Sequence, residues 1–313
     1  MIKLFKLVCF SVIHAISMYM GHYGKKYKDR KLLTEIIRNV HSIEKGMCLQ
    51  YTKPYYGMKK IRHLMEITDE YISCGFSKDR VELKMACGAL EAYTRLFDGE
   101  NQDIIDIKNY CNKLNKILET DNCNGYGGAI TIRQSEIEGQ SDLKSVILNR
   151  HSIRDFAEDR VPYEDLYKAI ELANHCPSAC NRQTTKVYIM EREKISTVKE
   201  WLSGIGGFVD CADKFLVITG KTSAFNYGEA NQYLVNAGIF AGYLTLCLND
   251  MGIGNCVVQR PLLYSKFWKK FAKENNIPFD ERIVCMIAVG KFKSEYKVPI
   301  SYKLPITDIS RVI

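Results

Sequence analysis

Two short stretches in the second half of the chain combine side chains suited to binding a phosphate and a planar heterocycle. The first reads RHSIRDF and places Arg150, Ser152 and Arg154 at every second position. In an extended segment these three side chains share one face, and His151 and Ile153 take the other. Two guanidinium groups and a hydroxyl on one face could hold a phosphate, because arginine offers paired planar donors. A solvated basic strand is the simpler interpretation of the same pattern.

The second stretch reads HCPSACNRQTTKVYIM and follows a predicted helix. It places Pro177 and Ser178 in a turn-rich loop, and the amides Asn181 and Gln183 just before a strand. Amide side chains both donate and accept hydrogen bonds, so they can bind the polar edge of a flat heterocycle. A helix end followed by a turn uses the same residue types. The stretch alone therefore fits a ligand-binding loop and a plain turn equally well.

The elements that would position these stretches alternate between helices and short apolar strands. A helix is predicted to begin at Pro162, because proline suits a first helical turn and Glu164 and Asp165 complement the helix dipole. Strands are predicted at 186–190, 215–219, 256–258 and 283–289, and further helices at 195–202, 229–252 and 264–275. This pattern predicts a layered domain with helices packed on a sheet. The alternation taken alone would suggest a parallel sheet.

The first part of the chain has a different pattern. Residues 1–120 are predicted to be mostly helical, with apolar residues at helical spacing in the segments 29–46, 57–75, 77–97 and 103–119. Residues 121–143 are rich in Gly, Asn and other polar residues without a helical period, so they are predicted to be a linker. Residues 144–313 form the predicted second domain.

The N-terminal end is basic, then apolar, then basic again. Residues 4–20 are interrupted by Ser11, His14 and Ser17, and they fall short of the roughly 20 apolar residues that a membrane span needs. No small-residue cleavage site of a signal peptide follows. We expect an amphipathic helix that docks on the protein or on a membrane surface, with peripheral membrane contact through residues 1–28.

Charge and cysteine content narrow the function classes. The net charge of +8 over 313 residues is spread along the chain, and suits an anionic small molecule or a membrane surface. Because the sequence has no zinc-finger spacing, RNP-like run or arginine-rich arm, no nucleic-acid partner is expected. The twelve cysteines lack C-x-x-C spacing, so we expect reduced thiols in a cytoplasmic protein and no metal site.

Taken together, the two stretches resemble the FMN-dependent nitroreductase family. That family has a basic R-x-S-x-R segment, a helix, and a loop A-P-S-x-x-N-x-Q-P-W that enters a strand. Here the pattern stands as Arg150, Ser152 and Arg154, then Pro177, Ser178, Asn181 and Gln183. The family's D-A-G and G-L-G appear as NAG at Asn236–Gly238 and GIG at Gly252–Gly254, and AVGKF at 288–292 matches its late strand. The resemblance covers roughly residues 144–313.

The resemblance implies that these residues bind FMN. The backbone from Val257 to Arg260 would face the isoalloxazine ring, with the Gln259 N–H near flavin N5, and Lys303 would return to the phosphate. The implied cofactor-binding residues are Arg150, His151, Ser152, Arg154, Pro177, Ser178, Ala179, Asn181, Gln183, Val257, Val258, Gln259, Arg260 and Lys303. No catalytic acid–base residue is implied, since flavin carries the hydride and electrons itself.

The implied fold is α+β, a nitroreductase-like FMN-binding domain whose central sheet is flanked by helices, preceded by a mostly helical region. The implied activity is an oxidoreductase that takes electrons from NAD(P)H, a transient donor, and reduces a small organic acceptor in a ping-pong reaction. A homodimer is implied, with FMN at the interface between the basic segment of one subunit and the Pro-Ser loop of the other. Two alternatives remain: a flavin-dependent dehydrogenase or modifying enzyme acting on a glycan-pathway metabolite, and a non-enzymatic flavin-binding module.

The chain departs from the family pattern at three places. The Pro-Trp after the glutamine is Thr184-Thr185, the helix aspartate is Asn236, and the C-terminal arginine is reduced to lysines. The stretch HSIEKGM (41–47) resembles the H-x-x-E-K-G-L of a nitroreductase subgroup that has an added helical region. This region could close over the flavin as a lid or stabilise the dimer as a helical collar.

Overall fold

The computed structural model describes residues 5, 8–9, 11–12, 28–50, 53–97, 101–137, 139, 142–194, 207–225, 229, 231–258 and 266–313. The chain forms two compact units. We call residues 1–13 and 132–296 the sheet unit, and residues 14–131 and 297–313 the helical unit. The division at 120 and 143 proposed from the sequence stays a prediction. The predicted helix at 195–202 and most of the apolar stretch at 4–20 lie outside the described residues.

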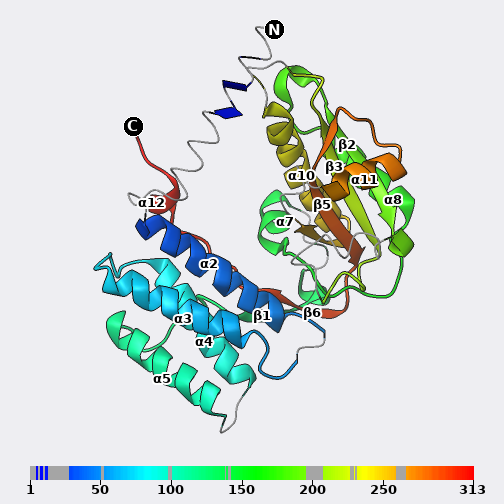
Figure 1. Ribbon diagram of the computed structural model, residues 1–313. Coiled ribbons are helices and arrows are strands. Elements are labelled where there is room, and N and C mark those ends of the chain that lie inside the picture. The colour runs from blue at the N-terminus through cyan, green and yellow to red at the C-terminus, as the bar shows by residue number, and fades with distance from the viewer. Residues whose placement is uncertain are drawn as a thin grey trace. The chain divides into compact units, whose positions relative to one another are not determined.

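The helical unit contains four helices close to those that the apolar periodicity predicts (Figure 1). They are α2 (Lys28–Met47), α3 (Met58–Ser73), α4 (Val81–Leu96) and α5 (Gln102–Ile117). Their apolar stripes form one core, in which Ile36, Leu64, Leu83 and Leu90 are fully buried. Asn101 caps α5, since its side-chain oxygen accepts from the backbone N–H of Asp103.

The HSIEKGM stretch lies in the last turns of α2, and its signature residues have packing roles. Glu44 is buried, and its Oε1 accepts from the backbone N–H of Gly128 at 3.1 Å. Gly46 lies against the ring of Tyr56, which would be only 2.0 Å from an added Cβ. Gly128 has a φ of +116°, a conformation that favours glycine. The stretch therefore holds a glycine-containing loop and a tyrosine ring in place.

Four further short elements are β1 (Ala129–Arg133), α6 (Gln134–Ile137), β6 (Glu295–Pro299) and α12 (Ile306–Ile309). Strands β1 and β6 form a two-stranded sheet, and the boundary between the units falls within both strands. In the helical unit the chain end is fixed by packing of the Tyr302 ring against the tilted ring of Tyr126, with centroids 4.7 Å apart, and by an ion pair between Arg80 and Asp308 at 3.0 Å.

The sheet unit is built on a four-stranded sheet with the order β2-β3-β5-β4. The strands are β2 (Thr185–Glu191), β3 (Lys214–Lys221), β4 (Ile253–Val258) and β5 (Glu281–Lys291). Every neighbouring pair is antiparallel, so the parallel arrangement that the alternation suggests is wrong. The strands of the pairs β2–β3 and β4–β5 are consecutive in the chain, and only the connection from β3 to β4, which contains α10, crosses over a strand. The α+β fold class, with its helical N-terminal region, is confirmed.

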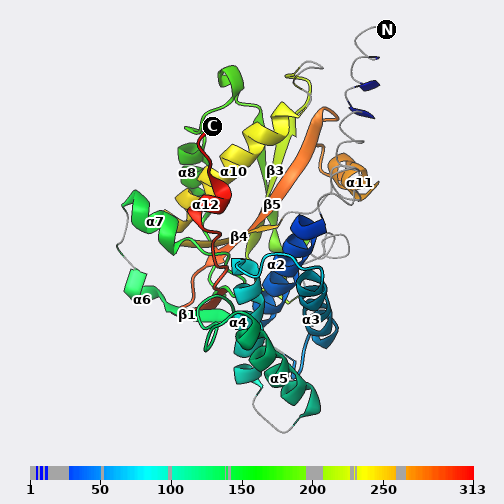
Figure 2. The same ribbon diagram turned by 90° about the vertical axis from the view of Figure 1, so that its left-hand side faces the viewer.

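Two helices cover one face of this sheet, and α11 (Lys266–Glu274) lies on the other (Figure 2). The covering helices are α8 (Tyr163–Ala173) and the long α10 (Gln232–Asp250). Their inner faces, including Leu166 and Leu244, share a buried cluster with Leu216 and Ile287 of the central strands. Burial on both faces explains why β3 reads as a continuous apolar run.

The basic segment follows α7 (Leu143–Asn149) and docks on the β4–β5 edge of the sheet. Its backbone pairs with both strands: the Ile153 N–H donates to the Asn255 carbonyl at 2.9 Å, and Ala157 N–H to the Lys291 carbonyl at 3.0 Å. Between these bonds, the ring of Phe156 lies directly over Gly290, 2.7 Å from where a Cβ would stand. The glycine of AVGKF therefore makes room for the aromatic residue of RHSIRDF.

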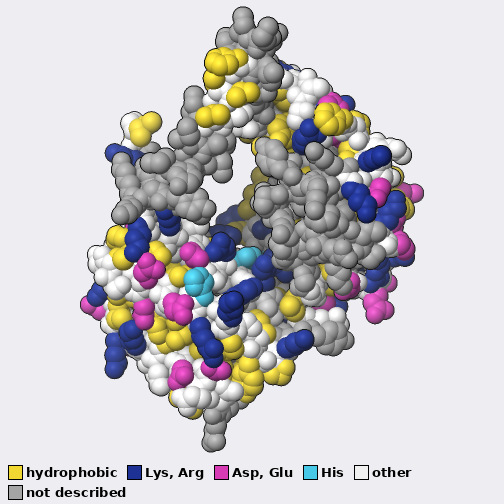
Figure 3. Space-filling view, viewed as in Figure 1, with side chains coloured by type: hydrophobic (Ala, Val, Ile, Leu, Met, Phe, Trp, Pro, Cys, Tyr) yellow, Lys and Arg dark blue, Asp and Glu magenta, His cyan; other side chains and the backbone are white. Residues whose placement is uncertain are grey.

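The described surface of the helical unit mixes both signs of charge. Figure 3 shows basic and acidic side chains interspersed over the face turned to the viewer. Several are paired, as Arg62 is with Asp103 and Lys113 with Asp69. No described helix is long and apolar enough to cross a membrane. Within the described residues, no cluster of His, Cys, Asp or Glu could hold a metal ion.

Replacing Gly290 with alanine should move the Phe156 ring and loosen the basic segment. Because the added methyl overlaps a buried ring, we expect the free energy of unfolding to fall by about 1–3 kcal/mol. Urea denaturation measures this change. Equal stability of the Gly290→Ala variant and the wild type would contradict this account of the packing.

Candidate functional site

The basic segment adopts the extended conformation that the spacing of its side chains predicts. Arg150 ends α7 with φ −72° and ψ 109°, and Ser152 forms an isolated parallel bridge with Asn255 of β4. Ile153 is buried, and so anchors the segment to the sheet. The segment is thus held by its backbone and its apolar side chains.

The two arginines of this segment have no anionic partner among the described residues, and Arg154 is buried while Arg150 is half-buried. Arg154 is only 6% exposed, and its Nη1 donates to the Ser152 carbonyl at 3.2 Å. Burial lowers the pKa of the Arg150 guanidinium, and the nearby Cys256 thiol partly opposes that shift. Among the described residues, neither arginine has a carboxylate partner. A buried cation costs free energy unless an anion compensates it, so the donor set here fits a phosphate.

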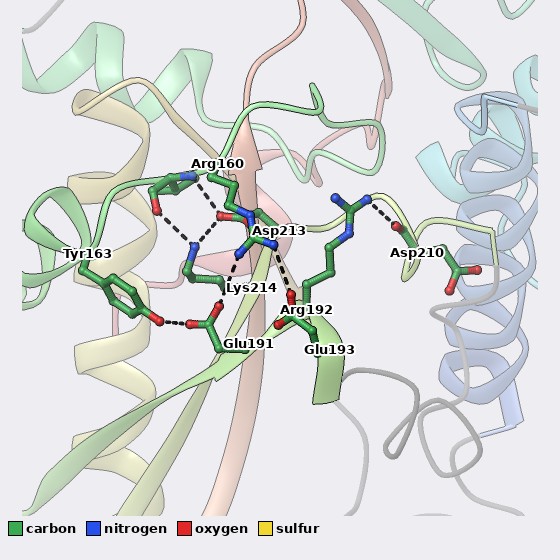
Figure 4. A network of polar contacts seen from close by, with 9 residues as sticks. Arg160, Tyr163, Glu191, Arg192, Glu193, Asp210, Asp213 and Lys214 are labelled. Carbon is green, nitrogen blue, oxygen red and sulfur yellow. Dashed lines mark hydrogen bonds and ion pairs between the residues drawn. The ribbon is translucent and has the colours of Figure 1, made fainter.

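The chain after the basic segment is fixed by a buried ion pair (Figure 4). Asp213 and Lys214 lie 2.6 Å apart at the start of β3, with both side chains almost fully buried. Together they hold both backbone groups of Val161: its N–H donates to Asp213 at 2.9 Å, and its carbonyl accepts from Lys214 at 3.1 Å. Tyr163 at the start of α8 donates to Glu191 at the end of β2. This network fixes the entry into α8.

The Pro-Ser loop lies between α8 and β2 and contains an unusual run of backbone conformations. Cys180, Asn181 and Gln183 have φ values of 51°, 54° and 47°. Left-handed conformations cost on the order of 1 kcal/mol or more each outside glycine, and they concentrate at functional sites. The Ser178 hydroxyl accepts from the Gln183 N–H at 3.2 Å, and Gln183 Nε2 donates to Asn181 Oδ1 at 3.2 Å. The loop is therefore organised by its own polar side chains, and Asn181 and Gln183 remain exposed.

Asn236 of α10 attaches this loop to the core. It is 2% exposed, and its Oδ1 accepts from the Ala179 backbone N–H at 3.2 Å. Its Nδ2 donates to the Thr184 hydroxyl at 3.4 Å. One amide therefore holds both ends of the loop. Thr184 and Asn236, two of the positions at which the chain departs from the family pattern, are therefore joined by a hydrogen bond.

The other predicted cofactor residues are distributed as follows. Val257 is half-exposed on a strand whose neighbours are buried, and Val258 is buried. His151 and Pro177 lie in the two segments already described, whereas Gln259 and Arg260 lie outside the described residues. Lys303 is exposed in the helical unit, so its assignment to the phosphate stays a prediction. Within one chain, no hydrogen bond between described residues joins the basic segment to the Pro-Ser loop.

Three residues that support the site were not identified from the sequence as its parts. Phe156 and Asn236 position the two segments, and Asn255 of β4 lies beside the basic segment. The Asn255 Nδ2 donates to the Thr245 carbonyl at 3.1 Å, while its Oδ1 is buried without a hydrogen-bond partner among the described residues. Asn255 could have been identified in the sequence as a polar residue inside the apolar strand GIGNCVV. A buried polar side chain needs hydrogen-bond partners, so such a residue indicates a structural or binding role.

The region that carries both motifs is similar to known proteins. Residues 147–204 match the family model described as Nitroreductase family. A protein from Streptococcus pyogenes named as an NAD(P)H nitroreductase is 25% identical over 203 residues, which are 53% of this chain and 98% of that protein. An iodotyrosine deiodinase from Thermotoga neapolitana is 25% identical over 173 residues, 47% of this chain and 87% of its own length.

Solved structures of similar proteins include a nitroreductase-like family protein from Bacillus cereus, with a TM-score of 0.46 and 18% identity over 55% of this chain and 96% of that chain. An FMN-dependent nitroreductase from Clostridium difficile has a TM-score of 0.42 and 24% identity over 47% of this chain and 86% of that chain. The family match lies within the region where the two motifs stand. The resemblance predicted from the two motifs is confirmed for residues 147–204, the part of the C-terminal region that the family model matches.

Replacing Asn236 with leucine should release the Pro-Ser loop, because Ala179 N–H and Thr184 lose their shared partner. We expect the free energy of unfolding to fall by about 1–3 kcal/mol, measured in urea. A leucine variant as stable as the wild type would show that these hydrogen bonds do not hold the loop.

Proposed function

We propose that this protein is an FMN-dependent oxidoreductase that accepts electrons from NAD(P)H and passes them to a small organic acceptor. The observation that carries the proposal is the pair of guanidinium groups in the basic segment, one buried and one half-buried, for which the described residues offer no carboxylate. A phosphate supplies the missing charge, and FMN presents one. The family match, at low identity to proteins named as NAD(P)H nitroreductases, indicates an oxidoreductase in general and supports this cofactor.

Each part of the site has a role in this proposal. Arg150, Ser152 and Arg154 bind the phosphate, and the exposed amides of Asn181 and Gln183 orient the heterocycle. When bound, FMN supplies the hydride and electron transfer itself. The chain binds it, sets its orientation and admits donor and acceptor in turn. A ping-pong reaction follows, because one site serves both partners.

The apolar side chain of Val257 belongs to the floor of the proposed site. It is 38% exposed although Cys256 and Val258, its neighbours on β4, are buried. An exposed valine on an otherwise buried strand is suited to packing against a planar ring. We assign the backbone at Val257 and Val258 to the isoalloxazine. The assignment of Gln259 and Arg260, which lie outside the described residues, stays a prediction.

We further propose a homodimer that forms through α10. Val235, Ile239 and Tyr243 are exposed at a spacing of four residues, so they form one apolar stripe. Gly238 and Gly242 lie between them, with open space where a Cβ would stand. Small residues between larger apolar ones allow two helices to approach closely. A dimer would let the basic segment of one subunit and the Pro-Ser loop of the other share a flavin.

Replacing Arg154 with alanine should weaken FMN binding roughly ten- to a hundredfold, because a charge-assisted contact is worth about 1.5–3 kcal/mol. Flavin fluorescence titration of the apoprotein measures the dissociation constant. Arg192→Ala is the matched control, because Arg192 is exposed and its guanidinium contacts only the Asp210 carbonyl in the described part of the chain. A double Arg150/Arg154 alanine variant that stayed fully yellow after dialysis would exclude this phosphate site.

Replacing Ile239 with glutamate should separate the dimer, because it places a charge in the apolar stripe. Light scattering should give about twice the chain mass of 35.9 kDa for the wild type and the single mass for the variant. Ile105→Glu, at a similarly exposed isoleucine of α5, should leave the dimer intact. A wild-type mass near that of one chain would refute the dimer, and dimeric Ile239→Glu protein would place its interface elsewhere.

A further inference from the structure

Three free cysteines of the helical unit lie close together, although they are far apart in the sequence. Cys87 is on α4, Cys111 is on α5, and Cys123 is in the segment that follows α5. Helices α4 and α5 pack side by side (Figure 1), and each of the three side chains is at most 4% exposed. We call these residues the thiol cluster. The proposed flavin site uses none of them.

The side chains of Asn115 and Glu91 organise the thiol cluster. The Asn115 Oδ1 accepts from the thiols of both Cys87 and Cys123, at 3.2 and 3.5 Å. The Asn115 Nδ2 donates to Glu91 Oε1 at 2.8 Å, and Glu91 Oε2 accepts from the Cys123 backbone N–H at 3.2 Å. Because one amide oxygen accepts from two sulfurs, the thiols of Cys87 and Cys123 are held within reach of each other.

The backbones that carry these two thiols also approach closely. A Cβ added at Gly88, next to Cys87, would lie 2.5 Å from the Cys123 carbonyl oxygen. A Cβ added at Gly127 would lie 2.6 Å from a backbone nitrogen of α4. Glycine at both positions therefore lets the segment 123–127 lie directly on α4. A disulfide needs Cα atoms about 4.4–6.8 Å apart, and this contact between the two backbones favours such a distance.

Cys111 is a less suitable partner for Cys87, although its sulfur belongs to the same cluster. Cys87 and Cys111 are both on helices, and packed helices keep their axes about 8–10 Å apart. The Cys87 thiol also lies 4.0 Å from the Cys111 carbonyl oxygen, which cannot take part in a disulfide. Cys123 lies outside any helix, on a backbone that contacts α4 directly. Its sulfur is therefore the better placed of the two to form a bond with Cys87.

Hydrogen bonds within the cluster make Cys87 the sulfur that reacts first. Hydrogen bonding with Cys111 raises the pKa of the Cys87 thiol, a hydrogen bond from Cys123 lowers it, and burial raises it. The hydrogen bond with Cys87 and burial raise the pKa of the Cys123 thiol, so Cys123 keeps its proton. Glu91 is half-buried, and its Oε1 lies 3.7 Å from the Cys87 sulfur. A small oxidant therefore has a short path to Cys87.

We propose that Cys87 and Cys123 are a redox modification site, at which hydrogen peroxide converts the two thiols into a reversible disulfide. The Cys87 sulfur attacks the peroxide, so that an S–O bond forms, the O–O bond breaks and one water leaves. The Cys123 sulfur then displaces the hydroxyl of this sulfenic acid as a second water, and the S–S bond forms. The thiols lose two electrons, which reduce the peroxide. A dithiol reverses the change by thiol–disulfide exchange.

The disulfide clamps the segment that leads to β1. In the reduced protein this segment is held by hydrogen bonds, from the Cys123 N–H to Glu91 and from the Gly128 N–H to Glu44. A covalent link to α4 restricts the opening of the segment, because it removes conformations from the opened state. Oxidation would therefore stabilise the end of the helical unit from which the chain continues into β1.

Peptide mapping of the full-length protein tests the cross-link directly. Folded protein is treated with hydrogen peroxide, the remaining thiols are alkylated in denaturant, and a non-reducing digest is analysed by mass spectrometry. We expect a linked pair of peptides that contain Cys87 and Cys123, and its loss after treatment with dithiothreitol. The pair should form more slowly than the exposed Cys74 is oxidised, because buried, protonated thiols react slowly.

Amide hydrogen exchange tests the clamp. Oxidation should slow exchange of the Cys123 and Gly128 amides roughly tenfold or more, because opening of the segment is restricted. Cys111→Ser should retain both the cross-link and this effect, whereas Cys123→Ser should lose both. The oxidised and reduced forms of each variant are compared with each other, so that any loss of stability from the substitution itself cancels.

Four results would overturn the proposal. One is the absence of the Cys87–Cys123 peptide pair from folded protein in which Cys74 is already fully oxidised. A Cys87–Cys111 pair in its place would show that the wrong partner was chosen. Sulfinic acid at Cys87 without a cross-link would show that Cys123 does not reach the sulfenic acid. Unchanged exchange at Gly128 in the cross-linked protein would exclude the clamp.

Discussion

The ring of Phe156 lies over the backbone of Gly290, and this contact determines where the basic segment stands. Flanking hydrogen bonds from Ile153 to β4 and from Ala157 to β5 leave the intervening backbone little freedom. The guanidinium of Arg154 is consequently buried by its surroundings rather than attracted there by a carboxylate. Packing and main-chain hydrogen bonds, which do not depend on charge, thus position the cationic site before any ligand binds.

Such an arrangement costs stability in the protein without its ligand. A buried cation and a loop with three left-handed residues are both unfavourable by about 1 kcal/mol or more. The surrounding structure holds these segments through the hydrogen bonds of Asp213 and Lys214 to Val161 and through the amide of Asn236. A ligand that binds only the folded state would return this free energy as stability. The strained backbone of the Pro-Ser loop and the unpaired charge of the basic segment are therefore both expected of a binding site that is preorganised for its ligand.

Much of this architecture could be predicted from the sequence, and the missing parts share a physical reason. Helical periodicity located α2 to α5 and α10, because each buries one continuous stripe. Strand direction was not predictable from alternation, since the pairing of β3 with β5 joins residues about seventy positions apart in sequence. The spacing of Arg150, Ser152 and Arg154 was visible locally. The support from Asn236 and Gly290 was not, because each acts on a segment more than fifty residues away.

The helical unit shows how a sequence signature can reflect packing rather than chemistry. In HSIEKGM, Glu44 is directed inward to a backbone N–H, and Gly46 is required by the ring of Tyr56. Tyr56 in turn donates to the Ile43 carbonyl at 2.7 Å, and its own carbonyl accepts from the Tyr93 hydroxyl at 2.8 Å.

Burial raises the pKa of the Tyr56 phenol well above its usual value, as expected for a ring held inside a core. Moving the loop that carries Tyr56 as a lid would break both hydrogen bonds and expose the ring, at a cost of several kcal/mol. A lid with this loop as its moving part would therefore open rarely. Of the two roles considered for the helical region, a collar that packs as a rigid body agrees better with these contacts.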